Sequence, residues 1–144
     1  MILIVDDDEL VVALVRQALE SCGYIVGAVD DGVSVIGIVE LKRPELVILD
    51  CGLPTFPGIE ALRQIRLSAT CFDTPVLVLT GRRGEADEAI AIRAGADDYL
   101  RKPFDCDNLI VRAEQLIARA KARKEALNPP LHPWIKRQSE LGAR

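Results

Sequence analysis

Three apolar segments of this chain end directly on polar side chains that could form one chemical site. One segment leads into Asp6 and Asp7, a second into Asp50, and a third into Thr80. If the segments are parallel strands, their carboxyl ends meet at one edge of a sheet, which is where open α/β folds bind ligands. Two unit charges about 4 Å apart repel by roughly 4 kcal/mol at an effective dielectric near 20, so clustered acids need a cation. The spacing therefore predicts one acidic, cation-dependent site.

The elements that would position this site alternate regularly between strand and helix patterns. Apolar residues recur at helical spacing between short β-branched runs, and glycines or Asp-Gly pairs stand at the turns. Such alternation is typical of a doubly wound α/β domain with a parallel sheet. Strands are expected at 2–5, 24–29, 45–49, 75–79 and 97–100, and helices at 8–21, 32–42, 58–68, 84–94 and 105–125.

Composition favours a soluble, cytoplasmic domain. A length of 144 residues is enough for one domain and a tail. The net charge of −4 argues against direct nucleic-acid binding by this segment. No apolar run reaches the ~20 residues that span a bilayer, and the chain opens on a strand pattern instead of a signal peptide, so no membrane contact is expected.

The cysteines do not indicate a metal or redox centre. Cys22, Cys51, Cys71 and Cys106 are widely spaced, and His132 is the sole histidine. A small buried thiol is the ordinary explanation even for Cys51, which follows Asp50 directly.

A domain boundary is expected near residue 122. Three prolines, Pro129, Pro130 and Pro133, end any helix there, and the segment after them is too short to fold alone. We therefore expect a folded domain over 1–122, and a linker or tail over 123–144 that could lead to an output domain.

Taken singly, the site residues have ordinary structural explanations. Asp8 suits a helix N-cap, and Asp6 and Asp7 could be first-turn acids that interact favourably with the helix dipole. Lys102 alone would be a solvated surface lysine. Their joint spacing on consecutive strand ends favours function instead.

The chain resembles the receiver domain of two-component response regulators. The resemblance covers residues 1 to about 122 and implies a flavodoxin-like sheet of five parallel strands in the order 2-1-3-4-5. It rests on the spacing of Ile4-Val5-Asp6-Asp7-Asp8, Leu49-Asp50, Leu53-Pro54, Gly58, Val78-Leu79-Thr80-Gly81 and Gly95-Ala96-Asp97-Asp98-Tyr99-Leu100-Arg101-Lys102-Pro103-Phe104.

The resemblance implies that Asp50 accepts a phosphoryl group from the phosphohistidine of a sensor histidine kinase or phosphotransfer protein. Mg²⁺ is the implied cofactor, since it prefers oxygen ligands. Its implied ligands are Asp7, Asp50 and the backbone carbonyl of Gly52, with Asp6 acting through water. The protein would be a switch with weak self-phosphorylation and autodephosphorylation activity, not an enzyme that turns over substrate.

Three further residues have implied roles in transfer and switching. Lys102 would pair with Asp50 and then with a phosphoryl oxygen, and the bond from Lys102 to Pro103 is expected to be cis. The Thr80 hydroxyl would donate to the phosphoryl group, and Tyr99 would move inward as Thr80 shifts. In the resemblance, Gly52 and Arg82 occupy positions that tune hydrolysis.

The surface used by winged-helix relatives for dimerisation is only partly retained. Asp98 and Arg112 match one cross-subunit ion pair, whereas Glu88 replaces a basic residue and Asn108 an acidic one. The expected homodimer, through the fourth helix, fifth strand and fifth helix, is therefore weak.

Two other kinds of protein stay open at this point. One is a pseudo-receiver that acts only as an interaction module, although such modules usually lose an acid, the threonine or the lysine. The other is a flavodoxin-like cofactor binder or an aspartyl phosphatase. No Gly-x-Gly-x-x-Gly follows the first strand, which argues against nucleotide binding.

Overall fold

The chain folds as a five-stranded parallel sheet between two layers of helices. We analysed a computed structural model of the protein, which describes residues 1–53, 57–81 and 85–129. The strands lie in the order β2-β1-β3-β4-β5, which confirms the predicted topology. The strands are β1 (Ile2–Val5), β2 (Val26–Val29), β3 (Leu46–Asp50), β4 (Val76–Thr80) and β5 (Asp98–Arg101), and the helices are α1 (Glu9–Ser21), α2 (Val35–Lys42), α3 (Gly58–Leu67), α4 (Glu85–Ala94) and α5 (Cys106–Leu127).

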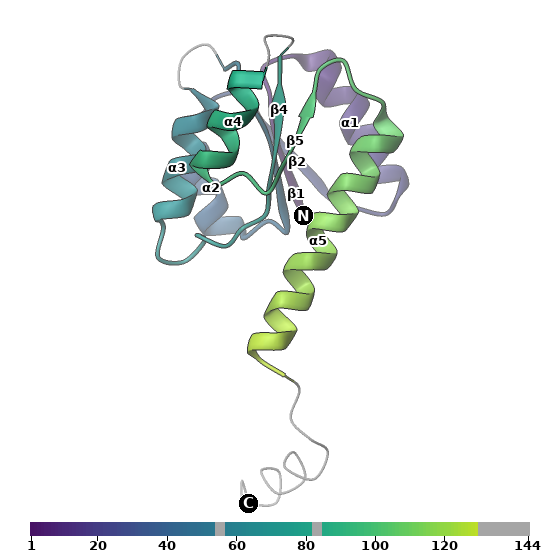
Figure 1. Cartoon of the computed structure of the whole chain (residues 1–144). Helices are drawn as coiled ribbons and strands as arrows, with labels where there is room; N and C mark the ends of the chain where they lie inside the picture. The colour runs from purple at the N-terminus through teal and green to yellow at the C-terminus, as the bar shows by residue number, and fades with distance from the viewer. Residues whose placement is uncertain (54–56, 82–84, 130–144) are drawn as a thin grey trace, which may run out of the picture.

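Each face of the sheet has its own apolar core. Helices α2, α3 and α4 cover one face, and α1 and α5 cover the other (Figure 1). Alternate residues of β1 enter the two cores: Leu3 and Val5 face α2 and α3, whereas Ile2 and Ile4 face α1 and α5. Because both faces of the central strands are buried, those strands are continuously apolar.

Element boundaries differ from the predicted ones where local hydrogen bonds compete with regular structure. The backbone amide of Tyr24 still donates to the Leu19 carbonyl at 3.2 Å, so β2 begins at Val26 instead of residue 24. The Asp31 carboxylate accepts the Ser34 amide at 2.7 Å, which makes a turn ahead of α2.

Helix α5 runs past the predicted domain boundary. It continues to Leu127 and extends beyond the amino edge of the sheet (Figure 1). Residue 122 therefore lies inside a helix, and the division into 1–122 and 123–144 stays a prediction. Within the described ranges, no helix combines the length and apolar character needed to cross a membrane.

Arg66 joins α3 to the loops at the amino ends of β4 and β5. Its guanidinium donates to the carbonyl oxygens of Phe72, Thr74 and Gly95 at 2.6–2.8 Å. It also pairs with the Asp97 carboxylate at 2.8 Å, and Asp97 in turn accepts the amide of β4 residue Val76. One side chain therefore satisfies three backbone carbonyls and a partly buried acid.

We predict that Arg66→Ala lowers the free energy of unfolding by about 2–3 kcal/mol, because it leaves several acceptors without a donor. Arg63→Ala is the matched control, since Arg63 lies one turn earlier in α3 and makes an exposed pair with Glu60. That substitution should cost about 0.5 kcal/mol or less. Urea unfolding measures both, and equal losses would contradict this account of Arg66.

Candidate phosphoacceptor site

Three acids meet at the carboxyl edge of the sheet. In the ladder between β1 and β3, Val5 pairs with Leu49, so the next residues, Asp6 and Asp50, also lie side by side. One carboxylate oxygen each from Asp6, Asp7 and Asp50 lies within 4.8 Å of the others. Asp6 and Asp50 are buried and Asp7 is exposed. Ligand oxygens at these separations, partly open to solvent, fit a small oxygen-preferring cation such as Mg²⁺.

Backbone amides hold two of these acids in place. Asp6 Oδ1 accepts the Asp8 amide at 2.9 Å, and Asp50 Oδ1 accepts the Gly52 amide at 3.0 Å. Each bond leaves the second carboxylate oxygen available. Asp8 is not part of the cluster: its Oδ1 caps α1 by accepting the amides of Leu10 and Val11, as predicted.

Lys102 supplies a cation between the two buried acids. Its Nζ lies 2.8 Å from Asp6 Oδ2 and 3.4 Å from Asp50 Oδ2. The expected pairing with Asp50 is therefore present, but the shorter contact is to Asp6, which the sequence did not predict. The Lys102 amide donates to the Thr80 carbonyl at 2.8 Å, and the bond from Lys102 to Pro103 is cis.

The environment shifts the pKa of both Asp50 and Lys102. Burial is the largest influence on Asp50 and raises its pKa, and the nearby Asp6 charge adds to it, against the Gly52 amide and Lys102. Burial alone would lower the pKa of Lys102, yet its hydrogen bond to Asp6 and the charge of Asp50 raise it overall. Lys102 thus stays protonated beside the carboxylates it contacts.

Thr80 ends β4 with a hydroxyl that has no partner. Only 1% of the residue is exposed. Among the described residues, its Oγ1 is the buried side-chain polar atom without a hydrogen bond. A buried unpaired hydroxyl is costly, and such groups often belong to functional sites. A ligand oxygen beside Asp50 and Lys102 would give this hydroxyl an acceptor.

Gly58 lies against the backbone of Asp50 at the start of α3. A Cβ placed on Gly58 would be 3.0 Å from both the carbonyl carbon of Asp50 and the Cα of Cys51, and closer still to the Asp50 carbonyl oxygen. The absence of a side chain at this position therefore lets α3 approach the end of β3. The sequence singled out Gly58 as a loop and motif residue but did not predict this close approach.

The charged residues of β5 pair within the chain. Arg112 from α5 contacts both carboxylate oxygens of Asp98 at 2.9 and 3.0 Å. Glu88 from α4 forms an ion pair with Arg101, a partner that the sequence did not predict. A hydrogen bond from Arg101 is the largest cause that lowers the pKa of Glu88, and the Tyr99 hydroxyl contributes less. The same neighbour, Glu88, raises the pKa of Tyr99.

The structure also places Gly52 and the four cysteines. Gly52 is exposed, and its amide donates to Asp50 Oδ1. None of the cysteines forms a disulfide, and Cys71 is buried whereas Cys51 is half-buried. Arg82 and His132 lie outside the described residues.

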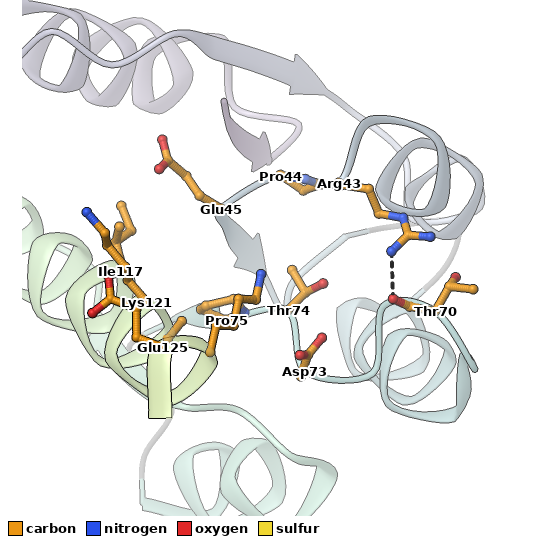
Figure 2. A pocket seen from close by; sticks show the side chains of 12 residues that line it. Arg43, Pro44, Glu45, Thr70, Asp73, Thr74, Pro75, Ile117, Lys121 and Glu125 are labelled. Atoms are coloured by element: carbon orange, nitrogen blue, oxygen red, sulfur yellow. Dashed lines mark hydrogen bonds between the residues drawn. The ribbon is translucent and has the colours of Figure 1, made fainter. Parts of the chain in front are cut away.

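A separate cavity of about 300 Å³ lies at the opposite edge of the sheet (Figure 2). Pro44 and Pro75, which precede β3 and β4, line it together with Ile117 and Lys121 of α5. Arg43 lies on the side of the cavity away from α5 and donates to the Thr70 carbonyl at 2.9 Å. The strand ends that carry Asp50 and Thr80 are at the other edge, so this cavity is not part of the acidic site.

Comparisons with known proteins agree with this geometry. Response regulator MprA of Mycobacterium avium is 39% identical over 125 residues, which is 87% of this chain and 54% of the relative. The chain thus spans about half the length of the curated relatives it matches.

Two solved structures share the fold. The receiver domain of the sensor histidine kinase PA1611 from Pseudomonas aeruginosa has a TM-score of 0.75 and 32% identity, over 81% of this chain and 96% of that one. It carries a magnesium ion in its active site cleft. NtrX from Brucella abortus has a TM-score of 0.81 and 30% identity, over 90% of this chain and 29% of that one.

The family model of the response regulator receiver domain matches residues 2–114. The chain therefore belongs to the receiver domains of response regulators, which act as switches in two-component signalling.

Proposed function

We propose that Asp50 accepts a phosphoryl group from the phosphohistidine of a sensor histidine kinase or a phosphotransfer protein. The observation that carries this proposal is the presence of two possible donors near Asp50. Lys102 Nζ lies 3.4 Å from Asp50 Oδ2, and Thr80, which follows the strand partner of Asp50, has an unpaired, buried hydroxyl. Both can donate to an oxyanion, and phosphoryl transfer asks a protein mainly for positioning and charge stabilisation.

The transfer balances as a displacement at phosphorus. A carboxylate oxygen of Asp50 forms the new bond, and the bond from phosphorus to the donor imidazole breaks. The electron pair of the broken bond stays on the imidazole nitrogen. The donor histidine is thus left as a neutral imidazole when its ring carries one proton. Lys102 can then exchange its contact with Asp50 for one with a phosphoryl oxygen.

Mg²⁺ is the proposed cofactor. Asp7 and Asp50 would bind it directly with the carbonyl oxygen of Gly52, and Asp6 would act through water. The donor set fits, since three carboxylate oxygens lie within 4.8 Å of one another. When bound, the ion neutralises negative charge on the acids and on the transferring group.

The output is a change in the surface formed by α4 and β5. Thr80 gains an acceptor when the phosphoryl group is present, and the half-buried Tyr99 lies on the next strand, where Val78 pairs with it. A ligand that contacts one arrangement of Thr80 shifts the population toward that arrangement. Tyr99 would follow Thr80 inward and alter the exposed face.

Self-association through α4, β5 and α5 is proposed to be weak. Asp98 and Arg112 already pair within the chain, as do Glu88 and Arg101. A dimer would have to exchange these contacts for similar ones across the interface, with little net gain.

The pseudo-receiver alternative is not favoured, because the three acids, Thr80 and Lys102 are all present. The acids and Lys102 lie together, and Thr80 pairs in register with Arg101, the residue before Lys102.

Treatment with acetyl phosphate and Mg²⁺ distinguishes a phosphoacceptor from a pseudo-receiver. We expect intact mass to rise by one phosphate that is stable in acid and labile in base, and EDTA to prevent the increase. Absence of any phosphate with Mg²⁺ present would contradict the proposal.

A further inference from the structure

The side chain of Glu88 extends from α4 to the β5 residues Tyr99 and Arg101. Side chains alternate along a strand, so Tyr99 and Arg101 of β5 project from the same face of the sheet, whereas Lys102 follows on the site edge. Glu88, Tyr99 and Arg101 line one surface hollow. The side chain of Glu88 is only 15% exposed and forms an ion pair with Arg101.

The contacts of Glu88 join α4 to the strand that carries the switch tyrosine. Arg101 pairs in register with Thr80, whose hydroxyl is buried without a partner. The Tyr99 ring packs at the border of the core under α3 and α4, and its hydroxyl lies beside the Glu88 carboxylate. This arrangement gives the Tyr99 side chain a carboxylate neighbour at the surface, whereas the Thr80 hydroxyl has no partner inside.

We propose that Glu88 is a positioning residue that holds the Tyr99 hydroxyl at the surface and so disfavours the inward arrangement of Tyr99. The proposal rests on the proposed function of Asp50, Thr80 and Tyr99. Moving Tyr99 inward would take its hydroxyl away from Glu88, which lines the same hollow, whereas the ion pair with Arg101 would keep Glu88 in place. Glu88 would thus set the equilibrium between the two arrangements before any phosphoryl group arrives.

The probe for this equilibrium is beryllofluoride with Mg²⁺, a mimic of the phosphoryl group. Its dissociation constant follows from the rise in thermal midpoint with ligand concentration. We expect Glu88→Ala to tighten binding about three- to tenfold, the range that loss of one hydrogen bond in the competing state allows. Glu88→Gln keeps an acceptor for the hydroxyl and should stay within about twofold of the parent.

Two controls separate this role from a general effect of losing a charge. Glu20→Ala removes an exposed glutamate that pairs with Arg16 on α1, and it should leave beryllofluoride binding unchanged. In a Tyr99→Phe background the hydroxyl is gone, so Glu88→Ala should no longer tighten binding.

A second readout follows Tyr99 directly. The chain has two tyrosines, so Tyr24→Phe leaves Tyr99 as the single site for 3-fluorotyrosine labelling. Without ligand, Glu88→Ala should move the ¹⁹F resonance toward its position in the beryllofluoride-bound parent.

Unchanged or weaker binding in Glu88→Ala, or an equal gain in the Tyr99→Phe background, would overturn the role of Glu88 while the parent still binds. A parent that does not bind beryllofluoride with Mg²⁺ would overturn the proposed function as well.

Discussion

Asp50→Asn is expected to lose all measurable phosphate incorporation and to unfold at a higher temperature than the parent at pH 7. The asparagine side chain lacks the nucleophilic carboxylate. Its oxygen can still accept the hydrogen bond that the Gly52 backbone amide donates to Asp50 Oδ1 in the parent. The change also removes a buried negative charge beside Asp6, and Lys102 keeps its 2.8 Å contact with Asp6. The expected gain in free energy of unfolding is about 1 kcal/mol, a common size for single-site effects.

The gain in stability should depend on pH in a defined direction. Burial raises the pKa of Asp50 in the folded protein above its unfolded value. The folded state therefore binds this proton more tightly, and the parent loses stability as the pH rises from the unfolded pKa through the folded pKa. The difference between Asp50→Asn and the parent should grow as the pH rises through the folded pKa and vanish below about pH 3.9, the ordinary aspartate value.

Thermal unfolding in EDTA at several pH values, with intact mass after acetyl phosphate treatment, measures both effects. Asp73→Asn is the matched control, because Asp73 is exposed and lines the cavity at the opposite edge of the sheet. It should keep both the parent's phosphate incorporation and its stability. An Asp50→Asn protein that is less stable than the parent at pH 7 would show that the carboxylate supports the fold.

Gly58→Ala is expected to destabilise the protein by about 2–4 kcal/mol, at the upper end of effects from overpacking. The new methyl group would overlap the backbone of Asp50 and Cys51, which are part of a strand end and cannot rotate away. Helix α3 would have to move outward, and the end of β3 would lose its packing. Phosphate incorporation should fall too, because Asp50 would shift relative to Lys102.

Gly37→Ala is the control for Gly58→Ala. Gly37 lies inside α2, and nothing lies within 4 Å of an added Cβ. Alanine should therefore stabilise the protein by about 0.5–1 kcal/mol through helix propensity. Urea unfolding of the two variants should give opposite signs, and a Gly58→Ala protein as stable as the parent would contradict the close approach described for α3.

The sequence predicted well those features that depend on strand register. Asp6, Asp50 and Thr80 each end an apolar strand, and parallel pairing brings such ends together whatever the details of the helices. The strand order came from the resemblance and is confirmed by the sheet. Boundaries were less accurate, because a single bond such as that from Tyr24 to Leu19 decides where β2 begins.

Long side chains were the features that the sequence did not predict. Lys102 lies nearer to Asp6 than to Asp50, Glu88 pairs with Arg101, and Arg66 contacts two separate loops. These partners depend on rotamers and on how α3 and α4 sit over the sheet, which residue spacing does not encode. Glu88 was noted for its unusual charge at that position, and that charge was the available signal.

Chemical trapping is the most direct test of Asp50 as the phosphoacceptor. After treatment with acetyl phosphate and Mg²⁺, borohydride reduces an aspartyl phosphate to homoserine, which peptide mass spectrometry can locate. We expect homoserine at position 50, dependent on Mg²⁺, and unmodified aspartate at positions 6 and 7. Homoserine at another aspartate, or none at position 50 while intact mass records a phosphate, would show that Asp50 is not the phosphoacceptor.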